Sequence, residues 1–307
     1  MRWLAAAIFV LAGHQARAQR VFPGGPPFPF SDSVIVIPLG TGTPVPNPER
    51  SGPATAVVVG RRVFLFDAGA GVMRRMAAAG LPIDGVTAAF ITHLHSDHTL
   101  GLPDLILTSW VMGRSTPMRV HGPPGLRRMT DHLLAAWAED TVVRVKGLER
   151  GRPGGYRIVA RETTGGVVHD SDGVKITAIP VQHGEWKYAF AYRVDAAGRS
   201  IVISGDTRPS DALAQAAAGV DVLVHEVYPE SRIAMENRPG GEFWPRYLRE
   251  AHTSDVELGR LAATAKPRLL LLTHVIFMGA GEDEVLNGIR RGGFSGPVTF
   301  AKDLVRY

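Results

Sequence analysis

The stretch Thr92-His93-Leu94-His95-Ser96-Asp97-His98 holds four possible metal ligands within six positions, directly after an apolar run at residues 86–91. Alternate side chains of an extended segment share a face, so the first two histidines can bind one ion together. The turn that follows would direct the aspartate and the last histidine at a second ion. Histidine is scarce elsewhere, with 11 in 307 residues. The stretch therefore predicts a two-metal site at the end of a strand.

The ligand types indicate which metal to expect. Imidazoles together with one carboxylate favour zinc or another borderline divalent ion. The chain has no cysteine that could supply a thiolate instead. We expect two Zn²⁺ per chain, with Mn²⁺ or iron as alternatives because the same ligand types permit them.

Three more ligand candidates follow apolar runs farther along the chain. They are His183 after residues 179–181, Asp206 after residues 203–205, and His274 after residues 272–273. Side chains at the ends of strands can leave a sheet and converge at its edge. These three residues are therefore candidates to complete the site that the first stretch begins.

Composition indicates a folded α/β protein with one main domain. Apolar residues make up 45% and charged residues 21% of the chain, which argues against extensive disorder. Residues 33–307 are expected to form the domain, after a Pro- and Gly-rich lead-in at residues 19–32. Removal of residues 1–18, with Arg2 and Arg17, would reduce the formal charge from +5 to +3. This is a mild excess, far from the basic face expected of a nucleic-acid binder.

Residues 1–18 have the pattern of a secretory signal. Arg2 supplies a positive start, residues 3–12 are apolar, and Ala16-Arg17-Ala18 offers a small-residue cleavage site. The apolar run is too short for a stable membrane helix, although an uncleaved anchor is the alternative. We therefore expect a periplasmic or secreted protein with no stable membrane span after cleavage.

Apolar and β-branched runs between Gly, Pro and Asn clusters predict strands, and runs with helical periodicity predict helices. The expected strands cover residues 34–39, 54–59, 63–66, 86–91, 174–179, 189–194, 201–204, 222–224 and 269–272. The expected helices cover residues 72–79, 97–107, 211–218, 254–265 and 282–290. This mixture occurs twice along the chain, which predicts two similar α/β halves.

The ordered ligand series resembles that of the metallo-β-lactamase fold superfamily. More narrowly, Leu39-Gly40-Thr41-Gly42-Thr43-Pro44, Gly205-Asp206-Thr207 and Ala251-His252-Thr253 are similar to motifs of its ribonuclease Z branch. The resemblance implies that residues 33–307 form a catalytic domain with an αββα fold. In this fold two mixed β-sheets are flanked by helices, and a dinuclear metal site lies at the sheet edge.

The resemblance also implies a role for each site residue. The first metal would be bound by His93, His95 and His183, the second by Asp97, His98 and His274, with Asp206 between them. Asp97 is also expected to contribute to catalysis. His252 matches a histidine used beside the leaving group, and Glu226 matches the acidic residue that orients it. Asp67 is expected to support the metal loop through hydrogen bonds rather than to bind an ion.

Two features suggest which member of the branch this chain resembles. Members that process tRNA carry a long arm between the third ligand block and the Gly-Asp-Thr block, whereas here only residues 195–200 separate the two strands. The missing arm and the export signal argue against nucleic acid as a partner. Residues 108–114 and 121–125 make the chain most similar to exported arylsulfatase-like members.

The expected function is therefore that of an exported dinuclear-zinc hydrolase of small anionic esters, either aryl sulfates or phosphodiesters. Hydroxide held by the metals would attack the ester. One alternative is a ribonuclease Z-like RNA endonuclease, and another is a lactone or β-lactam hydrolase. A module that keeps metal without turnover is also possible, and membership of this branch suggests a homodimer.

Overall fold

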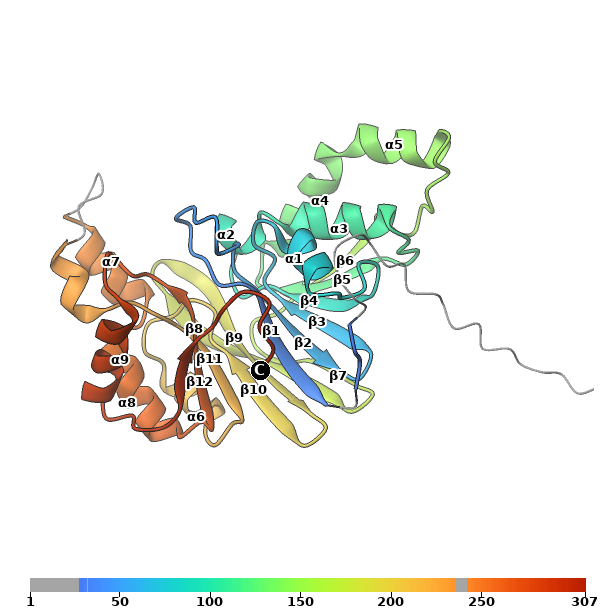
Figure 1. The fold of residues 1–307 in the computed structure, drawn as a ribbon. Helices are drawn as coiled ribbons and strands as arrows, with labels where there is room; N and C mark the ends of the chain where they lie inside the picture. The colour runs from blue at the N-terminus through green and yellow to red at the C-terminus, as the bar shows by residue number, and fades with distance from the viewer. Residues whose placement is uncertain (1–27, 32, 236–241) are drawn as a thin grey trace, which may run out of the picture.

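The computed structural model describes residues 28–31, 33–235 and 242–307 (Figure 1). The strands of these residues form two sheets. In spatial order, one sheet contains β1 (Val34–Gly40), β2 (Ala54–Val59), β3 (Arg62–Phe66), β4 (Val86–Phe90), β5 (Met118–Gly122) and β6 (Ile158–Glu162). The other contains β13 (Val298–Phe300), β12 (Leu269–Val275), β11 (Val222–Val227), β10 (Arg199–Ile203), β9 (Trp186–Ala196), β8 (Val174–His183) and β7 (Gly166–Ser171).

Both sheets mix parallel and antiparallel pairs. In the first sheet β1, β2 and β3 pair antiparallel, whereas β3, β4, β5 and β6 pair parallel. In the second sheet β7, β8, β9 and β10 pair antiparallel, and β10, β11, β12 and β13 pair parallel. The parallel pairs matter for function because they bring the carboxyl ends of successive strands to one edge.

Helices cover the outer faces of both sheets (Figure 1). The first sheet is covered by α1 (Val72–Ala78), α3 (Leu102–Val111) and α4 (Leu126–Ala136), beyond which α5 (Ala138–Lys146) projects. The second is covered by α6 (Asp211–Ala216), α8 (Asp255–Ala265) and α9 (Glu282–Arg291). The short α2 (Ser96–Thr99), the 3₁₀ segment η1 (Glu230–Met235) and α7 (Trp244–Ala251) complete the described helices. This arrangement confirms the expected αββα architecture.

Three apolar layers hold the sandwich together, as β3 illustrates. Val63 and Leu65 of this strand pack toward α1 and α3, whereas Phe64 and Phe66 pack between the two sheets. Tyr192 of β9 meets Phe66 from the other sheet, with ring centroids 5.6 Å apart. A third cluster fills the space between the second sheet and its helices. Because β3 is buried on both faces, its sequence is apolar at nearly every position rather than alternating.

The structure departs from the sequence-based expectations in several elements. The helix expected at residues 97–107 is divided into α2 and α3, because Pro103 has no backbone N–H to continue a helix and instead lies in the first turn of α3. Gly101 at this break packs so closely on the chain that a Cβ atom there would lie 2.2 Å from the Gly69 carbonyl oxygen. The elements β5, β6, β7, β13, α4, α5 and α7 were not predicted. Strands β6 and β7 are largely exposed and polar, so they lack the apolar run that identifies a strand.

The chain before Ser33 also takes part in the fold. Phe28 is buried and donates its backbone N–H to the Gly80 carbonyl at 3.0 Å, and Arg306 lies over its ring. The signal expected at residues 1–18 and most of the lead-in lie outside the described residues. Within the described part of the chain, no helix is long and apolar enough to cross a membrane.

Candidate metal centre and active site

The ends of strands from both sheets bring the ligand candidates together. The loop after β4 carries His93 and His95, and α2 presents Asp97 and His98. From the second sheet come His183 at the end of β8, Asp206 just after β10, and His274 near the end of β12. The site therefore lies where the edges of the two sheets meet, and each sheet supplies part of it.

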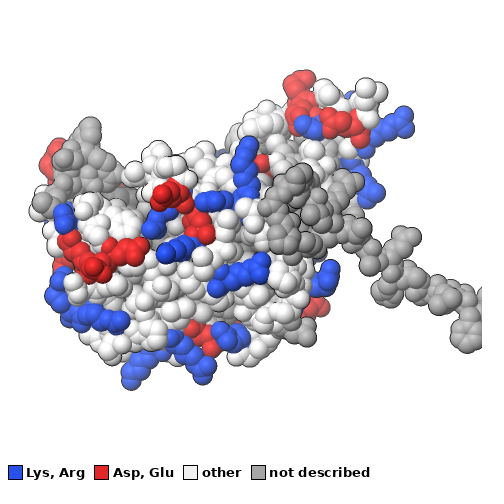
Figure 2. Space-filling view, in the orientation of Figure 1, with Lys and Arg blue, Asp and Glu red and all other residues white. Residues whose placement is uncertain are grey.

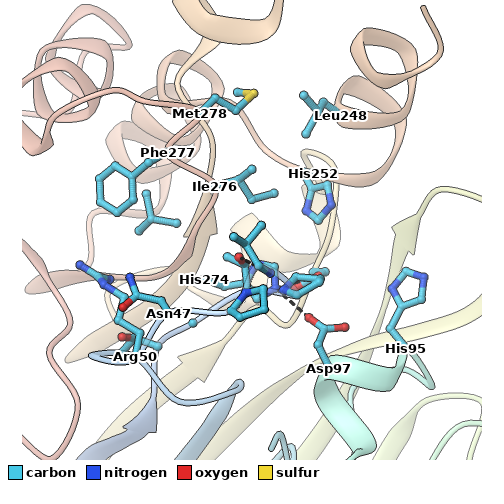
Figure 3. A pocket seen from close by; sticks show the side chains of 18 of the residues that line it. Asn47, Arg50, His95, Asp97, Leu248, His252, His274, Ile276, Phe277 and Met278 are labelled. Carbon is cyan, nitrogen blue, oxygen red and sulfur yellow. Dashed lines mark hydrogen bonds and ion pairs between the residues drawn. The ribbon is translucent and has the colours of Figure 1, made fainter. Parts of the chain in front are cut away.

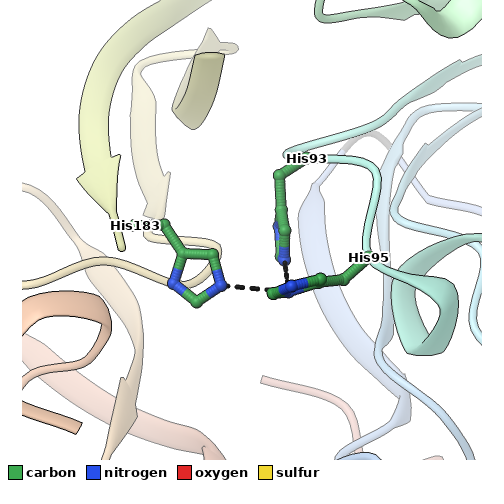
Figure 4. A group of neighbouring side chains, drawn as sticks. All are labelled: His93, His95 and His183. Atoms are coloured by element: carbon green, nitrogen blue, oxygen red, sulfur yellow. Dashed lines mark hydrogen bonds between the residues drawn. The ribbon is translucent and has the colours of Figure 1, made fainter. Parts of the chain in front are cut away.

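Three histidines form one group of converging ring nitrogens (Figure 4). Nδ1 of His95 lies 3.0 Å from Nε2 of His93 and 3.0 Å from Nε2 of His183. His93 and His183 are buried, whereas His95 is partly exposed. This is the trio expected for the first metal.

A second group lies next to the first and is built around two carboxylates. Oδ2 of Asp97 is 3.3 Å from Nε2 of His274 and 3.5 Å from Nε2 of His98. Oδ2 of Asp206 is 3.4 Å from the same His98 atom and 3.5 Å from the same His274 atom. The Asp206 atom is also 4.0 Å from Nε2 of His93, so this carboxylate stands between the two groups.

Hydrogen bonds behind the ligands determine which ring nitrogens face the site. His183 donates from Nδ1 to the Ala251 carbonyl at 2.7 Å, and His98 donates from Nδ1 to Asp67 at 2.8 Å. The Thr92 hydroxyl donates its single proton to Asp67 and so accepts from Nδ1 of His93 at 3.0 Å. When these three imidazoles are neutral, their Nε2 atoms therefore carry lone pairs that point inward.

Burial and the neighbouring charges set the protonation of the ligands. Burial lowers the pKa of His93 well below its usual range and that of His95 and His183 to about 4. Burial alone would raise the pKa of Asp206, but His274 and His98 hold it well below its usual range. His93, His95 and His183 are therefore neutral and Asp206 is ionised, which is the form in which these side chains bind metal. Burial lowers the pKa of His98 and His274, but the Asp206 charge and the other nearby carboxylates together outweigh burial and raise both, so these two imidazoles must lose a proton when a metal binds.

The chemistry of these side chains suits divalent ions. Converging lone pairs and buried carboxylates repel one another unless a cation lies between them. Nε2 of His98 and Oδ1 of Asp206 are buried and have no hydrogen-bond partner in the described residues. The donor set is imidazole and carboxylate, which suits zinc and similar ions. The residues fit a pair of divalent metals.

His252 and Glu226 form a buried pair beside the metal ligands. Nδ1 of His252 lies 3.0 Å from Oε2 of Glu226, and Glu226 also accepts the Thr207 backbone N–H at 3.0 Å. The His252 ring lies parallel to that of His274, with centroids 6.1 Å apart. Burial lowers the pKa of His252 to about 4, and burial followed by the Asp206 charge raises that of Glu226 well above its usual range. The pair can therefore share one proton.

Two of the site residues have a strained backbone. Asp67 has φ 60° and His274 has φ 44°, both in the left-handed region that non-glycine residues seldom adopt. Such strain costs about 1–3 kcal/mol per residue and persists where the surrounding structure requires it. Asp67 directly follows β3 and His274 lies near the end of β12, so both unusual conformations occur where a strand delivers a side chain to the metal centre or its support.

The metal groups lie on the floor of a cavity of about 780 Å³ (Figure 3). His252 points into this cavity from α7, opposite Asp97, and Ile276, Phe277 and Met278 form an apolar wall. Loop residues 41–50 close the remaining side. A cavity of this size can hold a nucleotide-sized group over the metal ligands.

Several residues around the cavity were missed by sequence reasoning. Arg50 lies in its wall over the Phe277 ring, and its buried Nη1 has no hydrogen-bond partner in the described residues. Asp303, near the end of the chain, accepts hydrogen bonds from Thr41 and Arg75 and so holds the cavity loop in place. Neither residue lies in a recognisable ligand block, so only contacts between distant parts of the chain reveal them.

The sequence of this chain is similar to those of known proteins. Residues 62–275 match the family described as "Beta-lactamase superfamily domain". Ribonuclease Z of Mycobacterium bovis is 35% identical to this chain over 283 residues, which cover 87% of this chain and 95% of that protein. Ribonuclease Z of Mycobacterium marinum is 36% identical over 275 residues, with 87% and 96% covered.

Solved structures share the fold. The short form of human tRNase Z superposes with a TM-score of 0.66 at 22% identity and covers 89% of this chain and 98% of the human chain. The metallo-β-lactamase fold protein YhfI from Bacillus subtilis gives a TM-score of 0.65 at 18% identity, with 89% and 98% covered.

The chain is a metallo-β-lactamase superfamily hydrolase and belongs to the ribonuclease Z family within it. The expectation of this branch is confirmed, and so is the coarser expectation of a hydrolase fold in which clusters of His and Asp could hold divalent metal. Similarity to arylsulfatase-like members, the zinc identity and export remain predictions from the sequence.

One expectation was wrong. The sequence analysis argued against nucleic acid and expected a small anionic ester as partner, whereas the relatives over nearly the whole chain are ribonucleases. That expectation rested on two features together, the missing arm and the expected export signal. Because the alignment covers 95% of the Mycobacterium bovis protein, that ribonuclease has little sequence beyond what it shares with this chain. The short segment at residues 195–200 therefore gives no reason to exclude RNA.

Proposed function

We propose that this chain is a metal-dependent RNA endonuclease of the ribonuclease Z type. The observation that carries the proposal is the buried His252–Glu226 pair beside two groups of converging metal ligands. Similarity to ribonuclease Z over 95% of the length of that relative supports it. RNA is a chain of anionic phosphodiesters, which two divalent ions held by these ligands would attract.

The cavity offers a contact for such an anion outside the ligand groups. Arg50 carries a positive charge in the cavity wall, and its buried Nη1 is a donor without a partner in the described residues. A buried unpaired donor is costly unless a ligand satisfies it. A phosphate oxygen of RNA would accept this hydrogen bond.

The residues divide the chemistry between them. Two divalent ions, when bound, supply Lewis acidity that activates water and stabilises charge on the attacked phosphate. The protonated carboxyl group of Glu226 donates a hydrogen bond to Nδ1 of His252. The ring proton of His252 therefore lies on Nε2, from which it can pass to the departing oxygen. As Nε2 gives up this proton, the carboxyl group of Glu226 passes its own proton to Nδ1. The raised pKa of Glu226 and the lowered pKa of His252 agree with this starting arrangement.

The number and identity of the metals belong to the same proposal. Five overlapping groups of three ligand atoms, each within 4.8 Å of one another, occur in the described residues. Two of them that share no residue, His93 with His95 and His183 and Asp97 with His98 and His274, support two ions per chain. Zinc is favoured because most of the ligands are neutral imidazoles. Elemental analysis of protein purified without added metal should give about two zinc ions per chain, and one ion or another element would contradict this part.

The function is tested by cleavage of a transfer-RNA precursor by the zinc-loaded protein, with cleavage sites mapped on a sequencing gel. His252→Ala should lower kcat by about 10²- to 10⁴-fold, because the departing oxygen loses its proton donor. His132→Ala is the matched control, since this exposed histidine lies on α4, away from the ligands. Metal content should be equal in all three proteins.

Two results would contradict the proposal. No cleavage of precursor or unstructured RNA by a protein that holds its metals would show that RNA is not the substrate. Cleavage that His252→Ala leaves unchanged would show that another group protonates the leaving oxygen.

A further inference from the structure

A second cavity of about 470 Å³ opens beside the metal centre. Its lining includes the metal-site residues His95 and His183 together with three aromatic side chains, Trp186, Phe243 and Tyr247. Trp186 begins β9, whereas Phe243 and Tyr247 belong to the start of α7. The cavity therefore lies between the start of β9, which follows His183, and α7, which ends directly before His252.

The position of Trp186 follows from a tight hairpin. His183 ends β8 and pairs directly with Trp186 across the turn formed by Gly184 and Glu185. Gly184 has φ 51°, which lets the turn close in so few residues. The chain thus places a tryptophan opposite a metal-ligand candidate, and the Trp186 ring meets that of His95 edge-on, with centroids 5.0 Å apart.

These aromatic side chains are more exposed than core packing would leave them. Trp186 is 37% exposed and Phe243 is 69% exposed, although both are large and apolar. Tyr247 contacts the rings of His183 and His252 at centroid distances of 6.4 Å and 5.5 Å. The aromatic surface therefore continues from the metal centre to the outside of the molecule.

The charges around the cavity identify the kind of group that it fits. Arg246 is paired with Glu250 at 2.8 Å, and Glu185 adds a second carboxylate to the lining. The cavity thus has no excess of positive charge and is a poor site for a phosphate. Flat apolar surfaces with mixed polar groups at the rim suit an uncharged planar ring, such as a nucleobase.

We infer that Trp186, together with Phe243 and Tyr247, forms a nucleobase subsite that holds one base next to the scissile phosphate. The inference rests on the proposed RNA endonuclease function and adds the contact that selects the position of the RNA. Stacking of a base on an aromatic side chain changes binding by about 5- to 150-fold. Trp186 also donates its indole N–H to Nε2 of His95 at 2.8 Å, so a purely structural role must be separated from stacking.

The test measures binding rather than turnover. Short dye-labelled single-stranded RNA is titrated into zinc-loaded His252→Ala protein, which keeps every proposed metal ligand, with and without Trp186→Ala. Affinity is read from fluorescence anisotropy. Three versions of the RNA are compared. One is intact, one has an abasic nucleotide directly on the 5′ side of the cleavage position, and one has an abasic nucleotide directly on the 3′ side. Trp137→Ala is the matched control, because Trp137 is 39% exposed but lies between α4 and α5.

We expect Trp186→Ala to weaken binding of intact RNA by about ten-fold. One of the two abasic RNAs should bind the parent protein as weakly as intact RNA binds Trp186→Ala. This abasic RNA should lose no further affinity when Trp186 is replaced by alanine. Trp186→Phe should recover most of the affinity, since the phenyl ring still stacks but cannot donate to His95. Trp137→Ala should bind like the parent protein.

Equal loss of affinity for all three RNAs, or no loss for any, would overturn the subsite. Failure of Trp186→Phe to recover affinity, with metal content lowered, would assign Trp186 to the support of His95 instead. These binding outcomes are distinct from a failure of the proposed function, which is tested by RNA cleavage with the wild-type protein and His252→Ala.

Discussion

Asp67 shows how one buried carboxylate can organise a metal centre. It accepts hydrogen bonds from His98 and from both the backbone N–H and the hydroxyl of Thr92. Thr92 in turn accepts from His93. A single side chain thereby orients ligands in both metal groups, as expected from its place at the end of a strand. Its left-handed backbone conformation is maintained by these contacts.

Asp67→Asn should therefore weaken metal binding by about 10- to 100-fold. The amide would direct an N–H group at one of its present donors and leave that donor unpaired. Zinc affinity is measured by competition with a chromophoric chelator, and Asp131→Asn, on the exposed surface of α4, is the control. Unchanged affinity in Asp67→Asn would show that the ligands need no such support.

Arg50 gives a prediction about the substrate rather than the metal. Arg50→Ala should raise KM for RNA by about ten-fold and leave kcat nearly unchanged, because a phosphate contact made throughout the reaction is lost. Arg74→Ala, an exposed arginine on α1, should behave like the wild type. An equal loss in kcat would instead place Arg50 at the reacting phosphate.

At the scale of elements, the packing of α8 on α9 depends on residues without side chains. A Cβ atom at Gly288 would lie 1.8 Å from Oδ2 of Asp255, and one at Gly292 would lie 2.6 Å from the Cα atom of Gly259. The two helices thus approach until their backbones nearly touch. Helix α8 follows directly after His252 and begins with a capping box formed by Ser254 and Glu257, so its position affects the active site.

Gly288→Ala should destabilise the fold by about 1–3 kcal/mol through overpacking at this contact. The melting temperature, followed by circular dichroism, should fall by roughly 2–4 °C for each kcal/mol. Asn287→Ala changes an exposed neighbour on the same helix and should have little effect. If both variants melt alike, the helices must be able to separate slightly without cost.

At the scale of the whole molecule, the metal centre joins the two sheets. His93, His95, Asp97 and His98 follow strands of the first sheet, whereas His183, Asp206 and His274 belong to the second. Basic and acidic side chains are scattered over the face shown in Figure 2 rather than gathered in one basic field. Recognition of RNA is therefore expected to depend on the cavities at the centre more than on this face.

Zinc should consequently stabilise the whole fold. Free zinc at 1,000 times its Kd contributes about 4 kcal/mol, so removal of metal by a chelator should lower the melting temperature by roughly 10 °C. Re-addition of zinc should restore it, whereas His274→Ala should show a smaller difference between the two forms. A melting temperature that does not respond to metal would mean that the sheets are held by packing alone.

The expected export signal remains a prediction at this scale. It rests on residues 1–18, which lie outside the described part of the chain. Cell fractionation together with sequencing of the mature N-terminus tests it. A cytosolic protein that begins at Met1 would contradict the signal.

The sequence by itself determined the α/β class, nine of the strands, and the identity of every proposed metal ligand. The reason is local: buried strands require apolar runs, and a ligand block directly after such a run must lie at a strand end. For the same reason the exposed strands β6 and β7 escaped prediction.

Tertiary structure alone decided what surrounds these ligands. Residues far apart in the chain, such as Arg50 and Phe277 or His95 and Trp186, meet only because the sheets pack face to face. The inward-pointing lone pairs likewise depend on Asp67 and the Ala251 carbonyl, which no sequence spacing relates to the ligands. Substrate contacts are made by residues that are distant in the sequence and meet only in the folded chain. Sequence reasoning therefore identified the candidate ligands but chose the wrong class of partner.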